Sequence, residues 1–314
     1  MDSLDKALLC ELSTNARVSY QALARKFSIS PNTVKNRINK LCQQKVILKF
    51  GVALSMEMIG AEHLSGVIST DGSEKVIEFM EQIATQPMVM EIYRTSDRRY
   101  EFWAIVEGVG ETLGFQKFLE ALDSVDDVEI RPIEFYYPNH PPNFCLNTRG
   151  KKVSFTQNQL RVLRCLTEDG RMPVAQIARQ TKLTPRRVRK ILRELEKGGG
   201  VHITTRTEFL VFGDMEYRLK IDYDKTQITG RKIIDWIYEK YPHEFWWASV
   251  TTNEPIVDVG LLLDSPGKSI LIISEIKGAS FTREVEDFLS YPRVVRGNAR
   301  PRIRLEEMLR EAGL

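Results

Sequence analysis

The sequence predicts an α+β protein built from a two-part unit that occurs twice, each time as a winged helix-turn-helix followed by a ferredoxin-like βαββαβ domain. The first observation behind this prediction is the distribution of charge. The whole chain carries a net charge of only +3, but residues 1–50 carry +6, residues 51–150 carry −10, residues 151–206 carry +10 and residues 207–314 carry −3. Charge therefore alternates basic, acidic, basic, acidic, as two copies of one unit would produce.

The second observation is a direct internal repeat. At an offset of 154 residues, "NARVSYQALARKFSISPNTVKNRINKL" (15–41) aligns without a gap with "DGRMPVAQIARQTKLTPRRVRKILREL" (169–195). The same offset superposes Tyr137-Pro138 on Tyr291-Pro292, so the match extends into the second part of the unit. A constant offset over this length indicates a tandem duplication of a unit of about 150 residues, a typical size for a small domain pair.

Apolar spacing predicts three helices in the first part of each copy. In copy one, apolar residues recur at helical spacing over 8–12, 22–27 and 34–41. The third helix opens at Ser30-Pro31, and its counterpart in copy two opens at Thr184-Pro185. Ser or Thr can cap the free N–H groups, and Pro suits the first helical position because its missing donor is not needed there. The short stretch between the second and third helices indicates a helix-turn-helix.

Extended runs follow the third helix in both copies. They are "VILKFGVAL" (46–54) and "VHITTRTEFLVF" (201–212). The second run predicts a hairpin wing with Thr205-Arg206 near its tip.

The second part of each copy is predicted to run strand, helix, strand, strand, helix, strand. In copy one the expected strands cover 63–70, 89–96, 99–107 and 128–137, with helices over 73–84 and 111–122. In copy two the expected strands cover 216–223, 244–252, 255–264 and 283–291, with helices over 230–241 and 268–278. This order predicts a ferredoxin-like sandwich with its helices on one sheet face. The sheet of the other copy is the expected cover for the second face.

These predictions divide the chain into six segments. A stretch rich in Pro and Asn after the first copy is the best linker candidate. The segments are a first winged helix-turn-helix (1–55), a first ferredoxin-like domain (56–138), a linker (139–153), a second winged helix-turn-helix (154–213), a second ferredoxin-like domain (214–293), and a basic C-terminal tail with a short helix (294–314).

The arrangement resembles the Lrp/AsnC family of prokaryotic transcription regulators. The residues that carry the resemblance are "LDKALLCELSTNARVSYQALARKFSISPNTVKNRINKL" (4–41), "VILKFGVALSMEMIG" (46–60) and "YRTSDRRYEFWAIVEG" (93–108). Members of the family usually carry one unit per chain and dimerise through the second domain, the RAM domain. The resemblance therefore implies that this chain is a covalent pseudo-dimer.

The resemblance also implies an effector site, from which this sequence departs. The family usually carries Gly followed by an acidic residue between the second and third strands, where an amino acid binds between subunits. This chain has Ser96 where Gly is expected in "TSDRRYE" (95–101), and "TTNEPIV" (251–257) has no such Gly. The departure argues against amino-acid sensing. The candidate effector residues at these loops are Thr95, Ser96, Asp97, Thr252 and Asn253.

The third helix of each copy is the predicted recognition helix, with an apolar side on its partner helices and a polar side facing the major groove. Copy two offers mainly Arg, which can bond both acceptors of guanine or neutralise phosphate, whereas copy one offers mainly Asn, which suits adenine. The two helices are therefore expected to prefer different half-sites. The predicted DNA-binding residues are Asn32, Thr33, Lys35, Asn36, Arg37 and Asn39 in copy one, with Arg186, Arg187, Arg189, Lys190 and Arg193 in copy two and Arg206 on the expected wing.

A basic helix face is often no more than a solvated surface. The capped three-helix arrangement, its duplication and the neighbouring basic wing favour DNA binding instead. The sequence thus predicts a sequence-specific DNA-binding transcription regulator, without catalysis, whose partners are double-stranded DNA and further copies of itself through the ferredoxin-like domains.

Composition excludes several other classes of protein. The chain is 42% hydrophobic and 28% charged, as in globular proteins, and has neither a signal-peptide core nor an apolar run long enough for a membrane span, so we expect a cytoplasmic protein. Its four cysteines and four histidines show no metal-ligand spacing, so no metal site and no cofactor are expected.

Two alternatives remain open at the level of sequence. Siroheme decarboxylases resemble the same two-part scaffold, and fold alone does not exclude catalysis. His63, Arg94 and His243 are the candidate residues for that chemistry in the sheet region. The other alternative is an architectural, chromatin-like protein that binds DNA with little sequence preference.

Overall fold

A computed structural model gives the fold. It describes residues 2–138, 149–207, 215–263, 265–296 and 300–314. Most of the predicted linker (139–148), the second arm of the expected wing (208–212) and part of the C-terminal tail (297–299) lie outside the described residues.

The chain forms two compact units, and each unit takes a part from both copies. The first comprises residues 1–59, 140–212 and 301–314, and the second comprises 60–139 and 213–300. The helix-turn-helix parts are thus grouped in one unit and the ferredoxin-like parts in the other.

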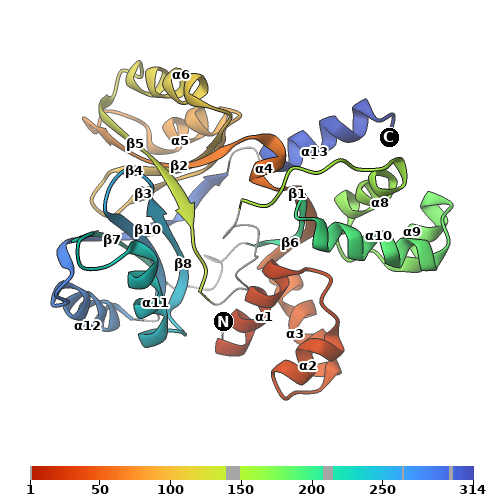
Figure 1. Cartoon of the computed structure of the whole chain (residues 1–314). Helices are drawn as coiled ribbons and strands as arrows, with labels where there is room; N and C mark the ends of the chain where they lie inside the picture. The colour runs from red at the N-terminus through yellow and green to blue at the C-terminus, as the bar shows by residue number, and fades with distance from the viewer. Residues whose placement is uncertain (1, 139–148, 208–214, 264, 297–299) are drawn as a thin grey trace. The chain divides into compact units, whose positions relative to one another are not determined.

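Short helices dominate the first unit (Figure 1). Copy one contributes α1 (Ser3–Thr14), α2 (Tyr20–Lys26), α3 (Pro31–Gln43), β1 (Ile47–Leu54) and α4 (Met56–Ile59). Copy two contributes α8 (Gln157–Glu168), α9 (Val174–Thr181), α10 (Pro185–Gly198) and β6 (Val201–Thr207), followed much later by α13 (Arg300–Glu311).

The predicted helix caps are confirmed. The Ser30 hydroxyl accepts a hydrogen bond from the Thr33 N–H at the start of α3, and the Thr184 hydroxyl accepts one from the Arg187 N–H at the start of α10. Pro follows the cap in both helices, where its missing N–H costs nothing. Ser28 and Lys182, which align between the copies, both adopt the left-handed conformation in the turn before the third helix.

Each helix-turn-helix is built on an apolar core, and the core of the second also contains Ala16, Val52 and Leu54 of copy one. In copy one, Leu8, Leu12 and Ile38 are buried from α1 and α3. In copy two, the core also takes in Leu305 and Leu309 from α13, so the C-terminal helix packs on the second helix-turn-helix. The Gln157 side chain at the start of α8 donates to the Ala312 carbonyl just beyond α13, and this hydrogen bond also ties α13 to α8.

Strand β6 does not form the expected hairpin wing within the described residues. It pairs antiparallel with β1 of the other copy, with Thr205 opposite Phe50 and Arg206 opposite Lys49. Thr205 and Arg206 lie near the end of the described part of this strand. The second arm of the predicted wing lies outside the described residues, so the hairpin stays a prediction. The alternating residues that indicate a strand do not reveal which strand will pair with it.

The second unit contains eight strands and four helices in its described part. Copy one contributes β2 (Glu62–Thr70), α5 (Val76–Ala84), β3 (Val89–Thr95), β4 (Tyr100–Val106), α6 (Val109–Glu120) and β5 (Val125–Phe135). Copy two contributes β7 (Met215–Tyr223), α11 (Gly230–Lys240), β8 (Phe245–Thr251), β9 (Ile256–Leu263), α12 (Pro266–Lys277) and β10 (Thr282–Arg296). The predicted βαββαβ order is confirmed in both copies.

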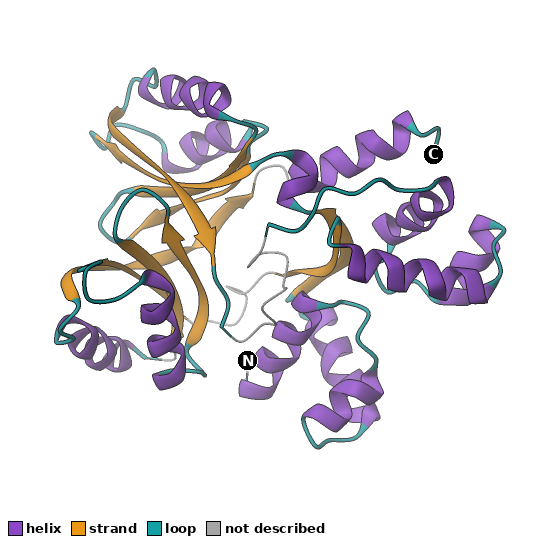
Figure 2. Ribbon diagram, viewed as in Figure 1, coloured by secondary structure: helices purple, strands orange, loops and turns teal. Residues whose placement is uncertain are grey.

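The two ferredoxin-like sheets join edge to edge into one closed antiparallel barrel. The strand order is β10-β3-β4-β2-β5-β8-β9-β7, and β10 also pairs with β7. The last strand of each copy crosses to the other copy, since β5 pairs with β8 and β10 pairs with β3. The helices lie outside the strands (Figure 2). The second sheet thus covers the first as predicted, but through backbone hydrogen bonds as well as side-chain packing.

Aromatic side chains from both copies meet between the sheets. The rings of Trp103 and Trp247 are 4.7 Å apart and nearly perpendicular. The buried Arg218 guanidinium lies over both indoles, at 4.7 Å and 4.8 Å from the ring centroids, and over the ring of Tyr93 at 3.8 Å. Burial lowers the pKa of Arg218 to about 9. Ion pairs with Glu101 and Glu216 offset part of the cost of burying this charge.

In the described part of the chain, no helix is long and apolar enough to cross a membrane.

A histidine between the two helix-turn-helix parts makes stability depend on pH. His202 on β6 lies 3.3 Å from the Thr14 carbonyl oxygen, and surrounding protein atoms lower its pKa to about 4 by disfavouring the charged form. Its neutral form is therefore favoured in the folded state. The unfolded chain takes up this proton first as pH falls below about 6.5, so stability is complete above that pH and falls between pH 6.5 and pH 4.

We expect His202 to lower the free energy of unfolding by about 2 kcal/mol when the pH is lowered from 7 to 5. His202→Gln should remove this part of the pH dependence, because the amide does not titrate. Denaturant unfolding at both pH values, with exposed His243→Gln as control, measures the difference. Equal pH dependence in the wild type and His202→Gln would contradict the assignment.

Candidate nucleic-acid interface

Helix α10 presents a basic surface on the side opposite its buried apolar residues. Its apolar side is formed by Val188, Ile191, Leu192 and Leu195, which are buried against the rest of the second helix-turn-helix. The other side carries the five basic residues predicted from sequence, of which Arg187 is half-buried and Arg186, Arg189, Lys190 and Arg193 are exposed.

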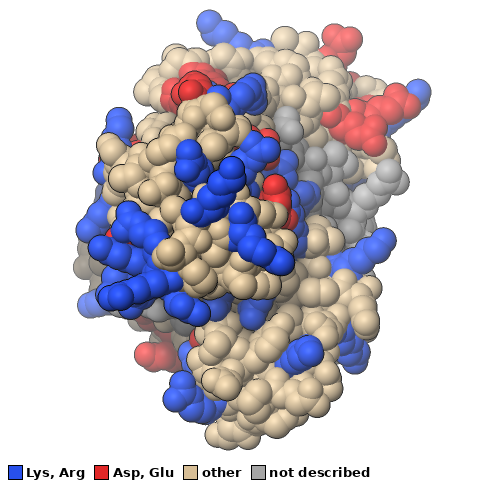
Figure 3. Space-filling model, turned by 90° about the vertical axis from the view of Figure 1, so that its right-hand side faces the viewer, with Lys and Arg blue, Asp and Glu red and all other residues tan. Residues whose placement is uncertain are grey.

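These basic side chains have few acidic partners. Lys190 lies 3.9 Å from Glu194 one turn later, and the Arg193 side chain donates to the Arg189 carbonyl oxygen. As far as the chain is described, no ion pair joins Arg186, Arg187 or Arg189 to a carboxylate. The face of the molecule that bears α9 and α10, on the right in Figure 1, shows many more Lys and Arg than Asp and Glu (Figure 3). The α10 surface is thus free to neutralise an external polyanion.

Helix α3 differs from α10 in that its arginine, Arg37, is already paired with acidic side chains. Arg37 is held by the first helix of its own domain, with Nη1 at 2.6 Å from Asp2 and 2.8 Å from Asp5. Burial opposes ionisation of Asp2, but the hydrogen bond from Arg37 leaves the pKa of Asp2 below its ordinary value. Sequence reasoning missed this pairing, because Asp2 and Asp5 lie some thirty residues before Arg37.

The remaining predicted residues of α3 lie at the surface. Thr33 takes part in the helix cap, where its hydroxyl lies 2.8 Å from that of Ser30. The exposed residues are Asn32, Thr33, Lys35, Asn36 and Asn39. Arg206 is also exposed, and it lies across the β1–β6 pair from Lys49, an exposed basic residue that sequence reasoning did not single out.

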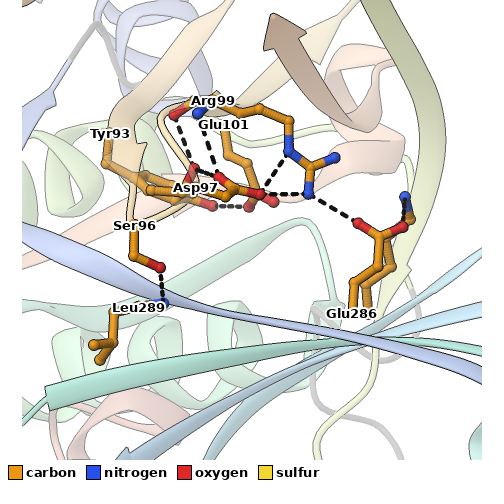
Figure 4. Close-up of polar contacts among 9 residues, drawn as sticks. Tyr93, Ser96, Asp97, Arg99, Glu101, Glu286 and Leu289 are labelled. Atoms are coloured by element: carbon orange, nitrogen blue, oxygen red, sulfur yellow. Dashed lines mark hydrogen bonds and ion pairs between the residues drawn. The ribbon is translucent and has the colours of Figure 1, made fainter.

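The candidate effector loop of copy one is closed by contacts with copy two (Figure 4). The Ser96 N–H donates to the Leu289 carbonyl at 2.9 Å, and the Leu289 N–H donates to the Ser96 hydroxyl at 3.0 Å. Arg99 then bridges Asp97 in its own loop and Glu286 on β10, the latter at 2.8 Å. The hydroxyl of the buried Thr95 donates to Asp97, and the Thr95 N–H donates to the Arg99 carbonyl at 2.9 Å, which fixes the turn.

The loop of copy two makes the corresponding contacts with the charges reversed. The Thr252 N–H donates to the Pro132 carbonyl at 3.0 Å, and Glu254 accepts from Arg131 on β5 at 2.8 Å, while Asn253 is exposed. In copy one the loop supplies Arg and the strand supplies Glu, whereas in copy two the loop supplies Glu and the strand supplies Arg. Sequence reasoning missed these pairs because their members lie more than 120 residues apart.

The candidate residues for enzyme chemistry lie in different local settings. The ring of His63 on β2 packs edge-on against Phe135 at 5.1 Å, and Arg94 on β3 lies over the ring of Tyr100. His243 is exposed just before β8. Among the residues that the structure describes, no group of three His, Cys, Asp or Glu could hold a metal ion.

Both helix-turn-helix parts match known family models. Residues 1–41 match the AsnC-type helix-turn-helix domain, and residues 155–199 match a winged helix-turn-helix DNA-binding model. The whole chain is similar in fold to the crystal structure of the siroheme decarboxylase NirDL, with a TM-score of 0.62 over 99% of this chain and 98% of that one. The sequence identity is 11%, so this likeness concerns the fold alone.

Several sequence relatives carry the name HTH-type transcriptional regulator. An uncharacterized HTH-type transcriptional regulator of Pyrococcus furiosus is 30% identical over 129 residues, which is 41% of this chain and 86% of the relative. The HTH-type transcriptional regulator Ptr1 of Methanocaldococcus jannaschii is 24% identical over 174 residues, which is 55% of this chain and 99% of the relative. With its AsnC-type first domain and its relationship to the Pyrococcus regulator, the chain belongs to the Lrp/AsnC family of transcription regulators.

Proposed function

We propose that this chain is a sequence-specific DNA-binding regulator of transcription, in which α3 and α10 enter the major groove as two unlike recognition helices. The observation that carries the proposal is the α10 surface. Arg186, Arg189 and Arg193 are exposed on the side away from the core of a capped third helix, which is the helix that a helix-turn-helix presents to DNA.

The two helices contribute differently in this proposal. Helix α10 supplies most of the electrostatic attraction, because its arginines are largely unpaired and each phosphate they contact releases counterions. In α3, Asp2 and Asp5 already neutralise Arg37. The exposed Asn residues of α3 can instead pair with adenine, which accepts and donates at adjacent positions in the major groove.

The first prediction concerns the α10 surface. Arg186→Ala with Arg187→Ala should weaken DNA binding by at least about tenfold at physiological salt and reduce the slope of log affinity against log salt by about 1 to 2, because up to two phosphate contacts are lost. Gel-shift titrations over a range of salt concentrations provide the measurement. The matched control is Arg161→Ala, an exposed arginine on α8. If the double variant kept wild-type affinity at each salt concentration, α10 would have no role in binding.

The second prediction concerns sequence preference. Selection from a random pool of duplex DNA at physiological salt should enrich a motif with two unlike half-sites, one containing guanine contacts for α10 and one containing adenine contacts for α3. Asn36→Ala should relax the preference in the adenine half-site alone. A symmetric palindrome would contradict the unlike helices, and binding without enrichment would favour the architectural alternative.

An enzyme on the same scaffold is the second candidate function. Its support is the likeness in fold to NirDL along almost the whole chain, but the fold alone does not carry an activity. In this second candidate function, the residues that would act on a tetrapyrrole are His63, Arg94 and His243. Titration of the purified protein with an iron tetrapyrrole, followed by absorbance, tests this candidate. We expect no saturable change in the absorbance bands.

We also propose that chains associate through the ferredoxin-like domains. All eight strands of the barrel are paired, so further association would use its helices. Two of these helices carry large apolar side chains that are more than half exposed, namely Val109 and Leu113 on α6 and Ile270 and Leu271 on α12. Exposed apolar groups of this kind are typical of protein contacts. Leu113→Glu with Ile270→Glu should lower the mass measured by sedimentation equilibrium. An unchanged mass, larger than one chain, would place the contact elsewhere.

A further inference from the structure

The two helix-turn-helix parts hold each other through a reciprocal pair of arginines. Arg17 and Arg171 occupy the same position in the two copies. Arg17 donates to the Gly170 and Met172 carbonyl oxygens at 2.7 Å and 3.1 Å. Arg171 donates in the same way to the Ala16 and Val18 carbonyl oxygens at 2.6 Å and 3.2 Å. Each guanidinium therefore spans the two residues that flank its counterpart.

The surroundings leave these reciprocal arginines little freedom. The Ala16 N–H donates to Ile203 on β6 and the Gly170 N–H donates to Phe50 on β1, each at 2.9 Å, so both segments are also tied to the shared strand pair. A Cβ atom at Gly170 would lie 2.8 Å from the Gly51 nitrogen, which shows how closely the backbones approach. The Arg171 guanidinium also lies 4.8 Å from the ring centroid of Tyr20.

The location of this contact links it to the recognition helices. Arg17 lies between α1 and α2, and Arg171 lies between α8 and α9. Each segment leads directly into the helix that precedes a recognition helix, so each hairpin of helices is held at its base. Burial lowers the pKa of Arg17, and its two terminal nitrogens each donate to a carbonyl oxygen of the other copy.

We propose that the reciprocal arginines fix the separation of α3 and α10, so that one chain accepts a single spacing between two half-sites on DNA. This inference rests on the proposed function. Arg suits the role because its planar fork can bond two carbonyls at once, whereas Lys carries a compact charge on a flexible stem. If a flexible tether joined the two domains instead, one chain would tolerate half-sites at several spacings.

The experiment uses the full chain and the DNA site selected from the random pool, with 0, 5 or 10 base pairs inserted between its half-sites. Five base pairs rotate the second half-site to the opposite face of the duplex. Ten restore the face but move the half-site about 34 Å along the axis. The wild type should lose at least about tenfold in affinity with either insertion, because only one helix can then bind its bases.

The test variant is Arg17→Met with Arg171→Met, and Arg161→Met is the matched control. The test variant should lose less affinity with the 10 base-pair insertion than the wild type does, because the two domains are held less firmly. Its salt dependence should match the wild type, because no residue of the DNA-contacting surface has changed. Arg17→Lys with Arg171→Lys replaces it if thermal melting shows that the Met variant is unfolded.

The outcomes separate this inference from the proposed function. Absence of DNA binding by the wild type would overturn both. Wild-type binding that tolerates the insertions, or selection of a single half-site, would overturn the fixed spacing but leave DNA binding intact. A folded variant that keeps the wild-type penalty for the 10 base-pair insertion would show that the arginines do not set the spacing.

Discussion

The backbone pairing between the two copies is the interaction on which the rest of this structure depends. Each ferredoxin-like sheet ends in strands whose outer N–H and C=O groups need partners, and an open edge of this kind invites association with other chains. Here β5 pairs with β8 and β10 pairs with β3, so each copy supplies the missing neighbour of the other. Because both copies are in one chain, this pairing does not depend on protein concentration.

The polar side chains around this pairing distinguish the two copies. Arg99 on a loop of copy one meets Glu286 of copy two, while Glu254 on the matching loop of copy two meets Arg131 of copy one. The cation is therefore on the loop at one junction between the copies and on the strand at the other. These contacts also occupy the loops where the family resemblance implied an effector.

Duplication has let the two helix-turn-helix parts diverge in chemistry while keeping their mutual contacts. Residues that hold the copies together remain the same, as Arg17 and Arg171 show. Residues on the exposed side of the third helix do not, since copy one offers Asn where copy two offers Arg. A homodimer could not separate these two requirements, because any change in one recognition helix would appear in both. The C-terminal helix α13 adds a further difference, because its Leu305 and Leu309 are buried in the same apolar core as the helices of the second helix-turn-helix.

The sequence by itself determined the elements, their order and the duplication. Ser30-Pro31 and Thr184-Pro185 mark helix starts through contacts within one turn, and the apolar periods of the strands and helices are equally local. The basic side of α10 could also be predicted from the sequence, because the helical spacing of its apolar residues shows which Arg side chains face away from the core.

Only the tertiary structure decided which surfaces meet. It showed that Asp2 and Asp5 engage Arg37, that Arg206 lies within a strand paired to the other copy, and that the domains regroup across the copies. Each of these contacts joins residues far apart in the chain. No local pattern encodes them, because a strand edge or a charged side chain is compatible with many partners until packing of the whole chain selects one.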